Sequence, residues 1–81
     1  MKRISKKMFS YTVVYQAVPE GGYVASVPSL SGCRTQGDSL EEAEKNIKEA
    51  IQLYLESLTA HRESAPREIR VLQGKVEISA C

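Results

Sequence analysis

The residues of this chain that could do chemistry are one histidine, two cysteines and a group of carboxylates. Cys33 and His61 are types that combine as nucleophile and base, and thiols with imidazoles also bind zinc. The spacing favours neither use, because Cys33 and Cys81 are isolated and no C-x-x-C pair exists. His61 follows a predicted helix, where a histidine favours the negative end of the helix dipole. We therefore predict no catalytic residue, no metal site and no cofactor.

The carboxylates are concentrated at the start of the same helix. Glu41, Glu42 and Glu44 could suggest acid–base work, but acids are expected there because they offset the positive end of the dipole. Gly21 and Gly22 do not form a phosphate loop, since no Lys-Ser/Thr follows them and no helix opens there. These patterns favour a binding module and predict that the protein is not an enzyme.

Length and composition bound the class of protein. The 81 residues form one domain with a small core, and oligomerisation commonly stabilises chains of this size. Two isolated cysteines indicate thiols in a reducing cytoplasm. No apolar run approaches the roughly 20 residues that cross a bilayer, and the first residues lack the apolar stretch of a secretory signal. We therefore expect a cytoplasmic location and no membrane contact.

The net charge of +1 argues against a dedicated nucleic-acid binder, which must neutralise many phosphates. Residues 1–7 are nevertheless basic, and we separate them as an N-terminal tail from a single domain at 8–81. The tail has two interpretations: a solvated segment, or an arm that contacts RNA, DNA or an acidic partner. Its candidate contacts are Lys2, Arg3, Lys6 and Lys7.

Three strands are predicted before the helix. Residues 8–18 alternate, with one face that carries Phe9, Tyr11, Val13, Tyr15 and Ala17. Turn residues 19–22 lead into a second alternating run at 23–27, so that a β-hairpin is the simplest account. Residues 33–36 are predicted to form a short third strand after a turn at 28–32.

A long amphipathic helix is the clearest prediction. Ser39 and Glu42 form a capping box, with Asp38 as a rival cap. Apolar residues then recur at steps of three and four: Leu40, Ala43, Ile47, Ala50, Ile51, Tyr54, Leu55 and Leu58. A helix of about 20 residues is about 30 Å long and can therefore cover the aromatic face of a small sheet.

A polar linker at 61–66 is followed by apolar and polar residues typical of a strand. We predict a terminal strand over about 71–79, with either a bulge or a turn at Gly74. The order β-β-β-α-β predicts an α+β fold of two layers, in which one long amphipathic helix packs on one face of a small antiparallel sheet.

The ordered string of motifs resembles the HicB family, the antitoxin half of bacterial and archaeal HicA–HicB toxin–antitoxin pairs. The resemblance covers about Tyr11 to Leu58 and the terminal strand. It depends on a first strand of Tyr/Val type and on the groups that follow it: Gly22-Tyr23 to Val27-Pro28, then Leu30, Gly32 and Cys33, then Gly37-Asp38-Ser39 with Glu41-Glu42-Ala43, and the Ile47/Ala50/Ile51 stripe. It implies a partly RNase H-like domain that binds a small mRNA-cleaving toxin. This chain resembles a short form, without the C-terminal DNA-binding segment of many relatives.

The resemblance also indicates which residues meet a toxin. A protein that holds RNA must be basic, so acids of this chain are expected to face it; the candidates are Glu20, Asp38, Glu41, Glu42 and Glu44. The alternative is an orphan domain of unknown cellular role that forms a homo-oligomer (dimer or tetramer). Its self-association would use the outer sheet residues Thr12, Val14, Val24 and Ser26. Nucleic acid is not expected to be a partner of the domain by itself.

Overall fold

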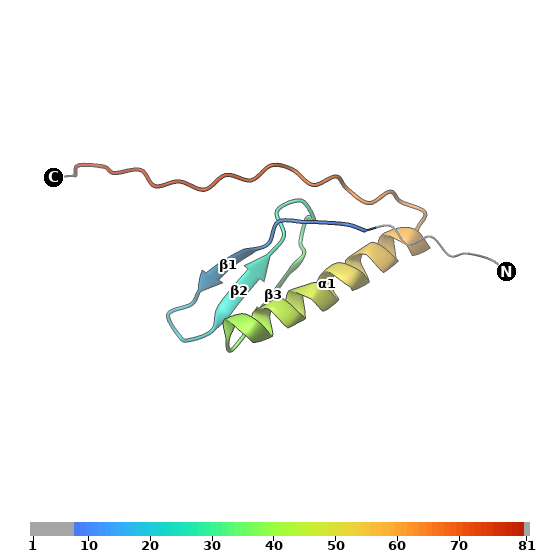
Figure 1. Ribbon diagram of the computed structural model, residues 1–81, viewed down its shortest axis with the longest axis horizontal. Coiled ribbons are helices and arrows are strands. Elements are labelled where there is room, and N and C mark those ends of the chain that lie inside the picture. Colours follow the sequence, from blue (N-terminus) through green and yellow to red (C-terminus); the bar gives the residue numbers. More distant parts are fainter. Residues whose placement is uncertain (1–7, 81) are drawn as a thin grey trace.

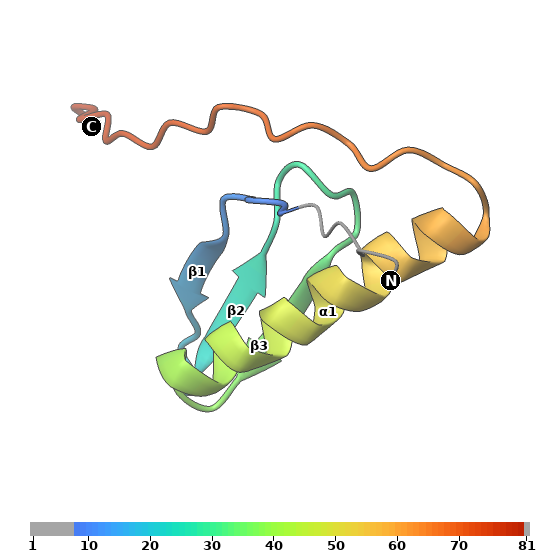
Figure 2. The same ribbon diagram turned by 45° about the vertical axis from the view of Figure 1, so that its right-hand side comes forward.

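The structure, a computed structural model, describes residues 8–80 (Figure 1). Its elements are three strands and one helix: β1 (Val14–Ala17), β2 (Tyr23–Ser26), β3 (Arg34–Gly37) and α1 (Leu40–Ala60). The strands form one antiparallel sheet in the order β1-β2-β3, and α1 lies across one face of it (Figure 2). The predicted α+β class, with a long helix on a small antiparallel sheet, is confirmed.

The strand register decides which residues face the helix. Tyr15 is paired with Ala25, and Ala25 with Thr35, so these three side chains share one face of the sheet. Ala25 is fully buried on that face. Val14 and Val24, which point to the opposite face, are half-buried.

The core is small and lies between α1, β2 and the turn before β3. Its buried hydrophobic residues are Ala25, Val27, Leu30, Cys33, Ala43 and Ile47. Around them pack partly buried residues that include the predicted aromatic layer and helix stripe: Tyr11, Val13, Tyr15, Tyr23, Ala50, Ile51 and Tyr54. Leu40, predicted to belong to the stripe, is 48% exposed at the first residue of α1, so that assignment was wrong.

β1 is shorter than the strand predicted over 8–18, because its partner ends early. β2 ends at Ser26, and the backbone N–H of Val27 donates to the carbonyl of Cys33 (3.0 Å) on the β3 side of the strand. Pro28 has no N–H to continue a ladder. Residues 8–13 therefore have no paired strand, although Tyr11 still packs on the core. Phe9 is half-exposed and stacks on Tyr11 with ring centroids 6.3 Å apart.

The turn between β2 and β3 closes on its own backbone groups. Leu30 N–H donates to the Val27 carbonyl, and Cys33 N–H donates to the Leu30 carbonyl, both at 3.0 Å. The side chain of Leu30 is fully buried, so this turn contributes one of the largest side chains of the core. The P-x-L-x-G-C sequence is thus a structural element that positions a hydrophobic side chain under the helix.

The start of α1 follows the predicted capping box with one difference. Glu42 N–H donates to the hydroxyl of Ser39 (3.1 Å), as expected for an N-cap serine. The carboxylate of Glu42 accepts from the backbone N–H of Asp38 (3.3 Å), one residue before the cap. Asp38 is therefore a partner of the box and is not the cap itself.

The predicted strand over 71–79 is not formed within this chain. Residues 63–80, here named the C-terminal segment, contain no strand, and no turn is formed at Gly74. Figure 1 shows the segment leaving the end of α1 and running past β1 as an extended trace. Bulge and turn were both wrong at Gly74, because each presupposes a paired strand.

Glycines allow the helix and the hairpin to meet at close range. A Cβ on Gly37 would lie 2.5 Å from the backbone nitrogen of Ala43, and one on Gly22 would lie 2.5 Å from the carbonyl oxygen of Gly37. Gly22 also has a φ of +86°, which other residues rarely adopt. The first turn of α1 therefore lies directly against the backbone of β3, and the β1–β2 turn lies against the end of β3.

We predict that Gly22→Ala and Gly37→Ala each lower the free energy of unfolding by about 1–3 kcal/mol, because the added methyl group meets fixed backbone. Gly74→Ala is the matched control, since a Cβ there has no neighbour within 4 Å, and we expect a change within about 0.5 kcal/mol. Urea unfolding at one protein concentration measures all three. Equal stability of Gly37→Ala and the unsubstituted protein would contradict the close approach.

Ile47 tests the helix face. It is 2% exposed, whereas Leu53 on the same helix is 66% exposed. We predict that Ile47→Ala lowers the free energy of unfolding by about 2–5 kcal/mol, because it removes buried methyl groups and leaves a cavity. Leu53→Ala should cost about 0.5 kcal/mol or less. Thermal or urea unfolding of the two variants gives the comparison, and similar costs would show that the face is assigned wrongly.

Candidate functional site

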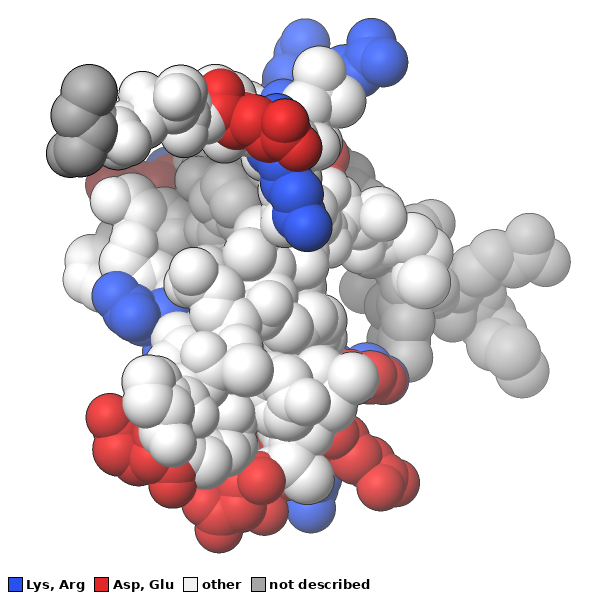
Figure 3. Space-filling view, turned by 90° about the vertical axis from the view of Figure 1, so that its left-hand side faces the viewer, with Lys and Arg blue, Asp and Glu red and all other residues white. Residues whose placement is uncertain are grey.

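The predicted toxin contacts lie at one end of the domain. Glu41, Glu42 and Glu44 are exposed on the first turns of α1, and Asp38 immediately precedes its cap. Glu20 belongs to the β1–β2 turn, whose Gly22 abuts the backbone of β3. Figure 3 shows acidic side chains gathered on this end of the molecule. We name these five residues the acidic end: Glu20, Asp38, Glu41, Glu42 and Glu44.

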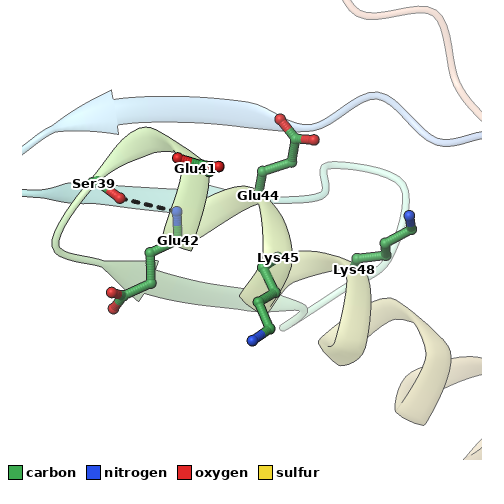
Figure 4. Close-up of a pocket in the computed structure, with 6 residues that line it drawn as sticks. All are labelled: Ser39, Glu41, Glu42, Glu44, Lys45 and Lys48. Carbon is green, nitrogen blue, oxygen red and sulfur yellow. Dashed lines mark hydrogen bonds between the residues drawn. The ribbon is translucent and has the colours of Figure 1, made fainter.

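A shallow groove of about 550 Å³ runs along the outer side of the helix start. Its lining is Ser39, Glu41, Glu42, Glu44, Lys45 and Lys48 (Figure 4). Figure 4 shows the ammonium groups of Lys45 and Lys48 directed away from the carboxylates of Glu41 and Glu44. Glu41 and Lys45, like Glu44 and Lys48, are four residues apart on α1, but they do not form ion pairs in the described part of the chain.

The carboxylates of the acidic end differ in how they are used within the domain. Glu42 is held by the capping box, because it accepts from the backbone of Asp38. Glu44 lies near the sheet: burial raises the pKa of Tyr15, and the negative charge of Glu44 raises it further. Glu41 has no such partner among the described residues, and its structural contribution is the charge that it places in the first turn of the helix.

The other candidate chemical groups have structural positions. Cys33 is 6% exposed in the core, and burial raises the pKa of its thiol, which keeps the thiol in its less nucleophilic form. His61 caps the end of α1 and places Nδ1 2.8 Å from the carbonyl oxygen of Ser57, so that nitrogen donates a proton. Among residues 8–80, no group of three or more histidine, cysteine or acidic side chains is arranged to hold a metal ion.

A polar clamp that the sequence did not predict holds the root of the C-terminal segment. The carboxylate of Glu68 accepts from the hydroxyl of Ser29 (2.6 Å), from the hydroxyl of Thr12 (2.7 Å) and from the backbone N–H of Thr12. Ser29 also accepts from the N–H of Ile69 (2.9 Å). Tyr11 donates its hydroxyl proton to the carbonyl of Pro66 (2.7 Å). These bonds fix where the segment leaves the domain.

The hydrogen bonds of the clamp change the acidity of its members. Those from Ser29 and then Thr12 favour the charged carboxylate and lower the pKa of Glu68. Burial raises the pKa of Tyr11, and the charge of Glu68 adds to that effect. The sequence offered no signal for this cluster, because Glu68 lies 56 positions from Thr12, just after the predicted polar linker at 61–66.

Two further expectations concern the surroundings of the domain. The predicted nucleic-acid contacts Lys2, Arg3, Lys6 and Lys7 lie outside the described residues. Within residues 8–80, no helix combines the length and the apolar character needed to cross a membrane.

The fold and the site define a small α+β domain with one acidic end. Comparison with known families specifies the class: the family profile described as the HicB-like antitoxin of bacterial toxin–antitoxin systems matches residues 11–79. The chain belongs to this HicB-like antitoxin family. The resemblance inferred from its motifs is confirmed.

Relatives are similar over most of the chain. A UPF0150 protein of Synechocystis sp. is 49% identical over 63 residues, which are 78% of this chain and 80% of that protein. A UPF0150 protein of Thermoplasma acidophilum is 52% identical over 58 residues, which are 72% of this chain and 84% of that protein. A UPF0150 protein of Helicobacter pylori is 63% identical over 41 residues. The family profile, which matches residues 11–79, covers the three strands and the helix.

The clamp predicts a pH dependence of the C-terminal segment. Because the pKa of Glu68 is lowered in the folded protein, its bonds are complete above the ordinary glutamate pKa of about 4.3 and are lost as the pH falls through the lower folded value. NMR titration should show the Thr12 amide shifting with a midpoint below 4.3. Glu68→Gln should abolish this shift. A midpoint at or above the ordinary value would contradict the clamp.

Proposed function

We propose that this chain neutralises a small HicA-like toxin that cleaves mRNA, by covering the toxin's RNA-binding surface through protein–protein contact. Membership of the HicB-like antitoxin family is the observation that carries the proposal, because an antitoxin needs a toxin as its partner. On this view the chain is a binding protein and not an enzyme. It acts in the cytoplasm, where mRNA and the toxin meet.

Charge supports the direction in which the two proteins dock. A toxin that holds RNA presents basic groups to the phosphates, so the complementary surface on its antitoxin is acidic. The acidic end gathers carboxylates from the β1–β2 turn and from the start of α1. Glu41 and Glu44 are exposed and are not closed into ion pairs with Lys45 and Lys48. These two carboxylates are the strongest candidates for contact with the toxin.

We also propose that the protein is a homo-oligomer. The support is its small core: only six hydrophobic residues are buried among those described, and several large apolar side chains are exposed. Chains of this size commonly gain stability by association. The outer sheet face, with half-buried Val14 and Val24, and the C-terminal segment are the surfaces available for it.

Charge reversal tests the docking surface. We predict that Glu41→Lys together with Glu44→Lys weakens binding to the cognate toxin at least about tenfold, because like charges then meet across the interface. The matched control is Glu49→Lys with Glu56→Lys, which makes the same change of charge farther along α1. Affinity measured by calorimetry at two salt concentrations, with rescue of growth during co-expression of the toxin, provides the readout.

The two variants separate the docking surface from the function itself. Loss of rescue and affinity by the Glu41/Glu44 variant alone supports docking through the acidic end. Equal effects of both variants would contradict that surface, although neutralisation could still hold. Failure of the unsubstituted chain to bind or neutralise the toxin encoded beside it would overturn the proposed function.

A further inference from the structure

The C-terminal segment exposes apolar side chains that its own domain does not cover. Leu72, Val76 and Ile78 are 80%, 84% and 81% exposed, and Ile69 is 53% exposed. The segment does not lack polar residues, because polar and apolar positions alternate along it. Large exposed apolar side chains in such an ordered pattern indicate a surface that another chain covers.

The pattern has the period of a β-strand. From residue 72 the even positions carry Leu72, Gly74, Val76, Ile78 and Ala80, and the odd positions carry Gln73, Lys75, Glu77 and Ser79. In an extended chain these two sets lie on opposite faces. One face is thus apolar throughout and the other is polar, with one positive and one negative charge. This is the pattern of a strand that is half-buried in a sheet.

The backbone of the segment also lacks pairing with a neighbouring strand. Among the described residues, no backbone–backbone hydrogen bond reaches 64–80. Figures 1 and 2 show the segment extending past the sheet without joining it. The protein measures 69 × 26 × 21 Å, and its radius of gyration of 16.4 Å exceeds the roughly 12 Å expected for a compact chain of this length. An unpaired extended strand is a template for pairing with a sheet edge.

The sheet offers a matching edge at β1. The sheet order leaves β1 and β3 as its two edges. At β3, the side chain of Asn46 donates to the carbonyl of Gln36 (2.9 Å), which engages part of that strand. No side chain of the described residues bonds the backbone of residues 14–17 in β1. The Glu68 clamp holds the root of the C-terminal segment beside Thr12, just before this edge.

We propose that residues 72–80 of one copy of this chain add as a fourth strand to the β1 edge of a second copy, which returns its own segment to the first. One chain carries both a donor strand and an acceptor edge, so two copies related by a twofold axis satisfy each other in a closed dimer. The apolar side of the added strand would extend the core face beside Tyr15. The terminal strand expected from the sequence is thereby formed between chains.

Cross-linking tests whether the C-terminal segment pairs with β1 of a second copy or with β1 of its own chain. The variant Gln16→Cys with Lys75→Cys, in a Cys81→Ser background, places one thiol on β1 and one on the segment, while Cys33 stays buried. Labelled (¹⁵N) and unlabelled chains are unfolded together, refolded and treated with a short bismaleimide. Peptide pairs that join a labelled β1 to an unlabelled segment support the exchange. Cross-links found only within single chains would overturn it.

Two full-length variants test the apolar face. Val76→Asp with Ile78→Asp should convert a dimer into a monomer in light scattering at micromolar concentration. Gln73→Asp with Ser79→Asp adds the same charges to the polar face and should leave the dimer intact. A monomeric unsubstituted protein, a dimer that survives Val76→Asp with Ile78→Asp, or equal loss with both variants would each overturn the proposal. So would a segment that binds only the toxin.

Discussion

The contact between the first turn of α1 and the backbone of β3 is the constraint on which the remaining structure depends. Gly37 has no side chain to hold the helix away, and Ala43 beside it is fully buried. This contact sets the position at which α1 begins, and the helical period then determines that Ile47, Ile51 and Tyr54 face the sheet. The close contact between α1 and β3 also determines the position of the acidic end, because its helix carboxylates directly follow the Ser39 cap.

The acidic end therefore has two physical origins, and they fall on different residues. Acids near a helix start stabilise the helix dipole whether or not a partner exists. Glu42 has a defined structural use in the capping box. Glu41 shares the first turn with Glu42 and also offsets the dipole, whereas Glu44 lies beyond that turn. Unlike Glu42, neither Glu41 nor Glu44 is held by the hydrogen bonds of the cap.

The sequence predicted what depends on neighbouring residues. The Ser39 cap, the helix stripe around Ile47 and the hairpin follow from spacing, and all are present. It overestimated β1, because alternation reports which side chains can face a core but not how long the partner strand is. The Glu68 clamp was missed for a related reason. Its bonds join residues that are 39 or 56 positions apart in the sequence, and no local pattern predicts them.

The terminal strand that was predicted but not formed has the same cause: alternation in a sequence does not report which strand will pair with it. The alternation around Val76 predicted a strand that the chain does not form, because a strand forms only where an edge pairs with it. In the proposed dimer the backbone groups of β1 would pair with the added strand, whereas in the proposed toxin complex Glu41 and Glu44 would act through side chains on α1. The two proposed contacts therefore use different groups of the domain. A dimer built in this way would keep both acidic ends accessible and present two docking surfaces to the toxin.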